Sequence, residues 1–457
     1  MNVDVQARNN DLIGRITRLA ETAGPIWIMI GLLAVFALVT MALFGRRREL
    51  MFLLIVATTF SGAMWSAVDS GSTLLRWTIL ILLAFNCLRL NVYFGTPMLL
   101  FLLYGIIGIS MIPLSDVIVW SIQTGGLLLL TMAAAIALSD VMVTPADLRR
   151  ILYLYLIAAS GWFVLGMLTL RQLVAAGNDV GRQSGVITSA PLFVITGGLL
   201  LVIAVWGTLC SKRWWGKAIC GALAMSLVAL LLASGQRTGT FAGMLGCLPM
   251  LIRKRASNLI FVVAAAAMVV ALAFGLATAN KKQVDFLKKR YFSSSTTGRT
   301  EIWANAIHEC MKNPMVGHGH GSDREFAIKY ARPTHNSLLA VWYATGIFGL
   351  IVYLAAFGVA AWQAFAVMRK SRDPDMRDLG RVLLGLLIAV FAAGMFETAN
   401  SPSNFSTITL TIVFVMVGRL WIMHREQAQT VPAVRYVWVP LTPGASGGGL
   451  RPMPGGA

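Results

Sequence analysis

The stretch that decides the fold runs from residue 336 to residue 367 and reads NSLLAVWYATGIFGLIVYLAAFGVAAWQAFAV. It contains no charged side chain, and it is longer than the roughly 20 apolar residues that cross a bilayer as a helix. Because the apolar residues are contiguous and do not alternate with polar ones, the stretch predicts a helix and not a strand of a membrane barrel.

Similar apolar runs recur from residue 26 to about residue 423. Hydrophobic residues make up 57% of the 457 residues and charged residues only 12%, against roughly 25% charged residues in a soluble domain. This composition excludes a single water-soluble globule and predicts an all-α, polytopic transmembrane bundle of about 12 spans. Thirteen runs are candidates, and a short neighbouring pair can form one broken helix: 26–44, 50–68, 74–93, 97–113, 117–138, 150–170, 189–208, 217–233, 238–252, 258–279, 336–367, 381–399 and 404–423.

Clusters of Lys and Arg between the apolar runs predict the orientation of the chain. The positive-inside rule places such clusters in the cytoplasm, so the long segment 280–335 faces the other side. The side of the N-terminus depends on whether the spans number twelve or thirteen. The same reasoning assigns the net charge of +19 to membrane topology, and we expect no nucleic-acid partner. The clusters lie at residues 46–48, 149–150, 212–217, 253–255 and 369–372.

These features divide the chain into four regions. We expect an N-terminal transmembrane bundle over residues 1–279, a helical cap loop over 280–335 and C-terminal transmembrane helices over 336–425. A disordered cytoplasmic tail rich in Pro and Gly is expected over 426–457. The five cysteines show neither a disulfide framework nor the spacing of clustered metal ligands.

The cap loop has the pattern of two short helices. The first begins near Thr300 and stops at Asn313-Pro314, and the second stops at Pro333. Ser322 and Glu325 have the spacing of a capping box at the start of the second helix. The first helix is expected to place four residues on one face, namely Trp303, Ala306, Ile307 and Cys310.

Basic residues on the expected outer side stand where loops turn into helices. Arg182 precedes one span, Arg237 lies between two spans, and His335 opens the span that follows the cap. Free N–H groups at a helix start suit a phosphate, and guanidinium groups add forked donors. The alternative for each arginine is snorkelling to the membrane interface, which positive-inside bias makes less expected on the outer side. Arg299 is a weaker candidate, because helix-start arginines are commonly solvated.

Other ionisable residues have simpler interpretations. Arg76 and Arg89 lie near opposite ends of one span, where snorkelling is the better explanation. His318 and His320 are expected to decorate a glycine turn, without the Cys, Asp or Glu partners of a metal site. Glu397 is the one carboxylate to watch, because ionisable residues at membrane depth are costly and often functional.

His335 has two interpretations: a structural histidine or a general base. Its place at a helix start near arginines favours the neutral imidazole that a base needs.

At these residues the chain resembles the O-antigen ligase and polymerase superfamily of membrane glycosyltransferases. The resemblance spans about residues 182 to 335, and the order and spacing of its motifs around one long loop carry it. The motifs are Ser234-Gly235-Gln236-Arg237, Thr297-Gly298-Arg299 with Ile302-Trp303, Asn313-Pro314-Met315-Val316-Gly317-His318-Gly319, and His335-Asn336-Ser337-Leu338 with Thr345-Gly346-Ile347-Phe348-Gly349.

The resemblance implies a GT-C-like fold in the bacterial inner membrane, with a periplasmic active site and no cofactor. An O-antigen ligase transfers a glycan from undecaprenyl diphosphate to a lipid A-core sugar, inverting the anomeric centre without a metal. Carried over residue by residue, Arg182, Arg237 and Arg299 would bind the donor diphosphate, and His335 would be catalytic. Gln236 departs from the family pattern, which has a Ser there, so no hydroxyl role is assigned.

Three alternatives remain at this stage. An O-antigen polymerase transfers the glycan to another lipid-linked repeat, and a protein O-oligosaccharyltransferase transfers it to Ser or Thr. A secondary transporter would also be polytopic and basic, but it should show related halves and broken helices near the bilayer midplane. Neither feature is evident in the sequence.

Overall fold

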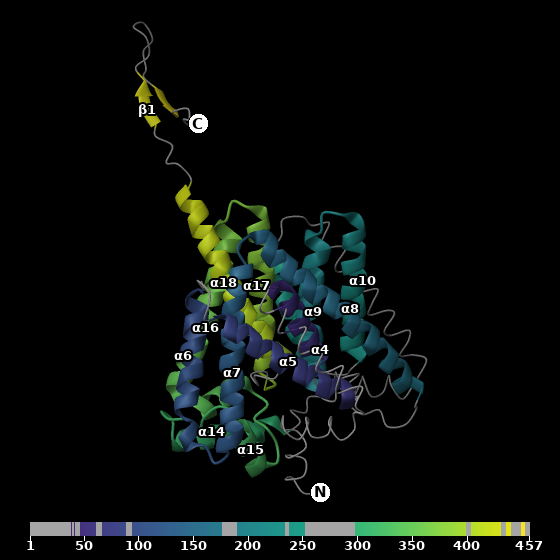
Figure 1. Cartoon of the computed structure of the whole chain (residues 1–457), viewed down its shortest axis with the longest axis vertical. Helices are drawn as coiled ribbons and strands as arrows, with labels where there is room; N and C mark the ends of the chain where they lie inside the picture. Colours follow the sequence, from purple (N-terminus) through teal and green to yellow (C-terminus); the bar gives the residue numbers. More distant parts are fainter. Residues whose placement is uncertain are drawn as a thin grey trace.

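A computed structural model gives the fold of the chain, and it describes residues 38, 41, 46–60, 66–87, 94–175, 190–233, 237–251, 298–398, 404–430, 436–439 and 449–452. Over these ranges the chain is helical apart from turns and one two-stranded sheet near its C-terminal end (Figure 1). The candidate spans 26–44 and 258–279 lie almost wholly outside the described residues.

The helices of the N-terminal region follow the apolar runs. They are α4 (Arg47–Phe60), α5 (Ser66–Cys87), α6 (Thr96–Ser110), η1 (Ile112–Leu114), α7 (Ile118–Leu138), η2 (Ser139–Val141), α8 (Pro145–Ala175), α9 (Ala190–Cys210), α10 (Trp214–Ala233) and α11 (Arg237–Leu251). The remaining helices are the two short ones of the cap, α14 (Arg299–Lys312) and α15 (Asp323–Tyr330), and then α16 (Ser337–Lys370), α17 (Pro374–Gly394) and α18 (Phe405–Thr430).

Four of these helices are long and apolar enough to cross a membrane, counting only the part of the chain that the structure describes. Three shorter apolar helices accompany them. The chain is therefore a helical membrane protein, whereas about 12 spans and a GT-C-like fold stay predictions. The four long segments are Ile118–Val141, Trp214–Leu232, Ser337–Lys370 and Phe405–Gln427.

Helix α17 is the centre of the packing that positions the site. It contacts α16 on one side and α9 and α11 on the other. Gly246 of α11 and Gly385 of α17 form a close seam, because a Cβ on Gly385 would lie 2.3 Å from the Gly246 carbonyl oxygen. Small residues allow membrane helices to approach this closely.

The seam also fixes the relative direction of α11 and α17. Gly246 faces Gly385 and Ala389, whereas Met250 faces Gly385, so the two helices run antiparallel. Arg237 and Gly394 each lie about 13 Å along their helices from the seam at 1.5 Å per residue. The N-terminal end of α11 and the C-terminal end of α17 therefore lie at the same end of the bundle.

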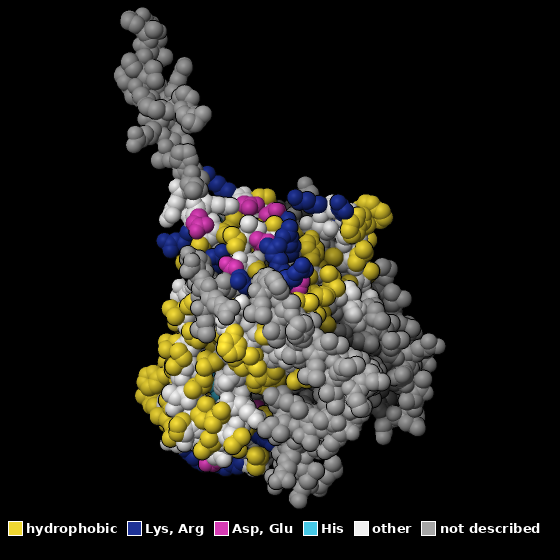
Figure 2. Space-filling view, in the orientation of Figure 1, with side chains coloured by type: hydrophobic (Ala, Val, Ile, Leu, Met, Phe, Trp, Pro, Cys, Tyr) yellow, Lys and Arg dark blue, Asp and Glu magenta, His cyan; other side chains and the backbone are white. Residues whose placement is uncertain are grey.

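Charged side chains gather at the end of the bundle opposite the cap (Figure 2). Three ion pairs tie helix ends together there: Arg47 with Asp140, Arg48 with Asp147, and Arg149 with Asp375. Helices α14 and α15 lie at the other end (Figure 1). The basic clusters that the structure describes and the two cap helices thus occupy opposite ends, whereas the side that each end faces stays a prediction.

The region predicted as a disordered tail contains secondary structure. Helix α18 extends to Thr430, and the strands β1 (Tyr436–Val439) and β2 (Gly449–Pro452) pair antiparallel beyond it. The pairing joins Tyr436 to Pro452 and Val439 to Gly449. The aromatic and β-branched residues of β1 favour a strand. The high Pro and Gly content of the whole tail masks this short pattern in the sequence. The division of the chain into four regions stays a prediction.

Candidate active site

The cap is a small folded unit with its own apolar core. Ile302, Ala306 and Cys310 of α14 pack with Phe326 of α15 and Tyr343 of α16. Ala306 and Cys310 are buried as the sequence predicts. Ile307, which the sequence places on the same face, is 44% exposed, whereas Ile302 is buried.

Glu309 joins the two helices of the cap. Its carboxylate accepts hydrogen bonds from Lys312 at 2.8 Å, from Lys329 at 3.0 Å and from the Tyr330 hydroxyl at 2.6 Å. Burial raises the pKa of Glu309, but these donors outweigh burial and hold its pKa at about 2. Glu309 is thus a satisfied structural carboxylate.

The capping box predicted for α15 is not formed. Ser322 has helical backbone angles, and its side chain makes no capping hydrogen bond. The Glu325 carboxylate accepts a hydrogen bond from the Tyr343 hydroxyl at 3.0 Å, which draws Glu325 toward α16 and away from the Ser322 N–H. Tertiary contact with α16 therefore replaces the local cap.

The glycine-rich segment between the cap helices docks on a kink in α16. Gly346 has a φ of 66°, which breaks the helical geometry of α16, and its Cβ would lie 2.2 Å from the Met315 carbonyl oxygen. The Pro314 carbonyl accepts hydrogen bonds from the Ile347 N–H at 2.9 Å and from the Trp342 indole at 3.1 Å. The Asn313–Gly319 and Thr345–Gly349 motifs thus form one structural joint, with no side chain of evident chemistry at its centre.

The two histidines of this segment anchor it. The His318 ring stacks on Tyr343 with centroids 4.3 Å apart, and the His320 ring packs edge-on against Tyr104 of α6. A Cβ on Gly108 would lie 2.1 Å from His320 Nε2, so the ring rests directly on the α6 backbone. Burial lowers the pKa of His320 to about 4, which keeps the ring neutral near pH 7. Both histidines contribute more than decoration, because they bind the cap to the bundle.

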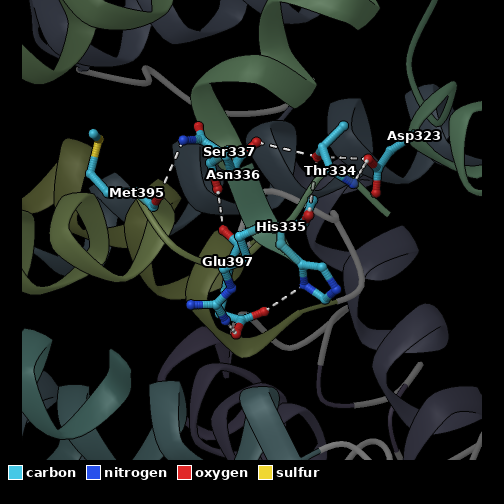
Figure 3. A network of polar contacts seen from close by, with 9 residues as sticks. Asp323, Thr334, His335, Asn336, Ser337, Met395 and Glu397 are labelled. Carbon is cyan, nitrogen blue, oxygen red and sulfur yellow. Dashed lines mark hydrogen bonds and ion pairs between the residues drawn. The ribbon is translucent and has the colours of Figure 1, made fainter. Parts of the chain in front are cut away.

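The residues around His335 form a polar network that joins the cap to α16 and α17 (Figure 3). The Thr334 hydroxyl donates to Asp323 of α15 at 2.9 Å. Asn336 caps α16 by accepting from Leu338 N–H at 2.9 Å and from the next N–H, and its amide donates to the Met395 carbonyl at 3.1 Å. His335 lies between these anchors with a φ of 48°, a left-handed conformation that is uncommon for residues other than Gly. The anchors on either side hold that conformation in place.

Glu397 links two of the predicted site residues. One carboxylate oxygen lies 2.9 Å from His335 Nδ1, and the other accepts from Arg299 Nη2 at 2.5 Å (Figure 3). The Glu397 side chain is only 7% exposed, whereas Arg299 and His335 are 23% and 28% exposed. The sequence predicts arginines around His335, but its direct neighbour is a carboxylate. This arrangement can orient a histidine base through its Nδ1 atom.

The other predicted residues have different outcomes. Arg237 is the first residue of α11 and lies at the same end of the bundle as Gly394, from which the chain runs on to Glu397. Arg182 lies outside the described residues. The snorkelling interpretation of Arg76 is wrong, because the residue is buried within α5 with 3% exposure and does not extend to the surface. Arg89 lies outside the described residues as well.

Sequence reasoning singled out Glu397, Arg299 and His335 separately but did not predict their contact. Arg299 and His335 are distant from Glu397 in sequence, and no local spacing connects the three. The sequence feature that points to Glu397 is its position as an isolated carboxylate at the end of a span. In the ranges that the structure covers, no group of three or more His, Cys, Asp or Glu side chains has the arrangement of a metal site.

Comparison with known proteins identifies the part of the chain that contains this geometry. A family model described as O-antigen ligase matches residues 221–354, which include Arg237, the cap and His335. Residues 221–354 are thus similar to the O-antigen ligase family. An O-antigen ligase from Pseudomonas aeruginosa is 31% identical over 138 residues, and the match covers 28% of this chain and 32% of that relative. The chain therefore spans about a third of the curated relative that it matches.

A solved structure described as "Structural coordination of polymerization and crosslinking by a peptidoglycan synthase complex" also aligns with the chain. The identity is 16%, and the alignment covers 73% of this chain and 98% of that one with a TM-score of 0.36. A TM-score at this level does not establish a shared fold. The O-antigen ligase region, residues 221–354, includes His335 but not Glu397.

Proposed function

We propose that this protein is an O-antigen ligase that transfers a glycan from undecaprenyl diphosphate to a sugar hydroxyl of lipid A-core. One observation carries the proposal: the O-antigen ligase region contains a histidine that is held by a buried carboxylate beside an arginine. The His335 side chain is 28% exposed, so it is partly accessible to a substrate.

The donor is bound by arginines. Arg237 stands at the start of α11, where the positive end of the helix dipole and a permanently charged guanidinium suit a diphosphate. Arg182 is proposed to share this role on the strength of the family resemblance. Electrostatic stabilisation of the departing diphosphate by preorganised arginines supplies much of the lowering of the barrier, and the transfer requires no metal.

His335 acts as the general base. The acceptor hydroxyl oxygen attacks the anomeric carbon, its proton passes to His335 Nε2, and the new glycosidic C–O bond forms. The bond between the anomeric carbon and the diphosphate breaks, and its electron pair leaves with undecaprenyl diphosphate. Attack from the face opposite the leaving group inverts the anomeric configuration. General base catalysis of this kind contributes about 10²–10⁴-fold.

The protein lies in the bacterial inner membrane with the cap in the periplasm. Apolar helix faces hold the polyprenyl chain in the bilayer, and the basic clusters at the opposite end face the cytoplasm. Labelling with an impermeant thiol reagent in intact spheroplasts tests this orientation. Glu301→Cys, on the exposed part of α14, should be labelled, whereas Arg372→Cys should be labelled only after permeabilisation. The reverse result would place the cap in the cytoplasm.

Reconstituted protein in liposomes tests the activity. With lipid-linked glycan and lipid A-core present, the expected product is glycan joined to lipid A-core, at a rate that chelators leave unchanged. Extension of the lipid-linked glycan without lipid A-core would identify a polymerase, and transfer to a protein acceptor would identify a protein O-oligosaccharyltransferase. Movement of the glycolipid across the bilayer without a new glycosidic bond would identify a transporter and overturn the proposal.

A further inference from the structure

Glu397 is held through both of its side-chain oxygens and through its backbone carbonyl oxygen. The side-chain oxygens contact His335 and Arg299, and the backbone carbonyl accepts from the Ser337 hydroxyl at 3.1 Å. Its backbone N–H donates to the Ala393 carbonyl at 3.0 Å, which fixes the turn that follows α17. A carboxylate held this firmly keeps its position when a substrate enters.

We infer that Glu397 is the positioning residue for His335 and that Arg299 acts through Glu397. This inference rests on the proposed role of His335 as the general base. A carboxylate can only accept hydrogen bonds, so His335 Nδ1 must carry the proton in the contact with Glu397. The lone pair then lies on Nε2, which is free to take the acceptor proton. Once Nε2 is protonated, the same carboxylate stabilises the imidazolium.

The geometry assigns Arg299 a different role from Arg237. The Nη2 atom of Arg299 donates to Glu397. The positive charge of Arg299 therefore offsets the carboxylate and holds Glu397 in the orientation that His335 needs. Arg299 also begins α14, and Trp303, one turn later, contacts Phe396 with ring centroids 6.4 Å apart. The start of α14 and the segment after α17 are thus joined by a polar and an aromatic contact. Arg299 therefore helps to position the histidine base, and other arginines bind the diphosphate.

Chemical labelling of His335 tests the inference without substrate. Diethylpyrocarbonate modifies neutral imidazole, and mass spectrometry follows its reaction with His335 as a function of pH. Within the described part of the chain, the charged groups facing His335 are Glu397 with its partner Arg299, and Asp323 across Thr334. Glu397→Gln removes the negative charge, so the pH at which labelling is half-maximal should fall by about one unit or more. Exposed His308 on α14 is the internal reference and should label equally in all variants.

Asp378→Asn is the matched control variant. Asp378 is also a buried carboxylate on α17, and it pairs with Arg381 at 2.5 Å. Its loss should leave the labelling midpoint of His335 where it is in the wild type. A Glu397→Gln midpoint equal to that of the wild type would overturn the inference, whether or not the protein transfers glycan. Failure of the proposed function appears separately, as a wild-type protein without transferase activity.

A double-mutant cycle tests the role of Arg299. If Arg299 acts through Glu397, Glu397→Gln and Arg299→Ala should each lower kcat by roughly 10²-fold, and the double variant should lose little more. The KM for the lipid-linked donor should stay close to the wild-type value. An Arg299→Ala variant with a raised donor KM and an additive loss in the double variant would show direct donor binding and contradict the assignment.

Discussion

The cap and the segment after α17 each contain a buried glutamate, and the two glutamates have different surroundings. Glu309 in the cap is enclosed by two lysines and a tyrosine of the same unit, all within α14 and α15. Glu397 draws its partners from distant elements, namely Arg299 at the start of α14 and His335, two residues before α16. Glu309 holds together a local fold, whereas Glu397 joins separate elements around a histidine.

The difference shows how a structural carboxylate can be told from one that serves chemistry. The contact with Glu309 raises the pKa of Tyr330, and burial raises it further; the same contact raises the pKa of Lys329. Both of these donors therefore stay protonated near pH 7. The partner of Glu397 is an imidazole, the one common side chain that exchanges its proton near neutrality. Burial alone would not separate the two sites, since both glutamates are almost fully buried.

Replacing the histidine should have the largest effect of the changes considered. His335→Gln keeps a polar side chain of similar reach but cannot take a proton near neutral pH. Transfer by the folded variant should fall by roughly 10²–10⁴-fold, while donor binding is kept. Single-turnover assays in liposomes measure the rate. A folded variant with near-normal transfer would leave arginine electrostatics and proximity to explain catalysis.

The donor arginine should come next. Arg237→Ala should weaken use of the lipid-linked donor more than Arg237→Lys, because a lysine keeps a point charge but not the forked geometry. We expect about 10–100-fold for the alanine variant, measured as donor kcat/KM, on the basis of the 1.5–3 kcal/mol typical of charged hydrogen bonds. Equal activity of both variants and the wild type would make Arg237 a structural residue of α11.

A single added methyl group on α6 should disturb the contact between the cap and this helix. Gly108→Ala places a Cβ against the His320 ring, whereas Gly126→Ala on α7 is the matched control because nothing lies within 4 Å of its Cβ. Overpacking should destabilise the Gly108 variant by about 1–3 kcal/mol and increase amide hydrogen exchange in residues 317–322. Gly126→Ala should leave both unchanged. Equal exchange in the two variants would show that the cap does not depend on this contact.

Acidification should give the smallest of these effects. The pKa of His320 is about 4 in the folded protein and about 6.5 when exposed, so between these values the unfolded chain binds more protons. Stability is therefore full above pH 6.5 and falls as the pH drops toward 4, by at most about 1.4 kcal/mol per pH unit. The melting temperature of His320→Gln should vary less than that of the wild type between pH 6.5 and 5. Parallel curves would assign the acid sensitivity to other groups.

Much of the helix pattern could be predicted from the sequence. The runs 117–138 and 238–252 correspond to α7 and α11 within one residue at each end. Helix α17 begins at Pro374, well before the run 381–399, because Asp373 caps it with a 2.8 Å bond from the Asp375 N–H. Apolar runs mark the part of a helix that is removed from water, whereas caps and polar turns set its true ends.

The candidate site was predictable only in part. His335 and Arg299 follow from motifs, because each stands where a loop turns into a helix. Their connection through Glu397 depends on the packing of α16 against α17, which no local spacing encodes. The capping box at Ser322 failed for the same reason, since Tyr343 of α16 draws Glu325 away.

The comparison between the two glutamates is tested most directly by single-turnover glycan transfer in liposomes with equal amounts of folded protein. Glu397→Gln should transfer roughly 10²-fold more slowly than the wild type, because the histidine base loses its orientation. Glu309→Gln should lower the melting temperature of the protein but transfer at close to the wild-type rate, because it supports only the cap. Similar transfer rates for the two variants, or slower transfer by Glu309→Gln, would contradict the account.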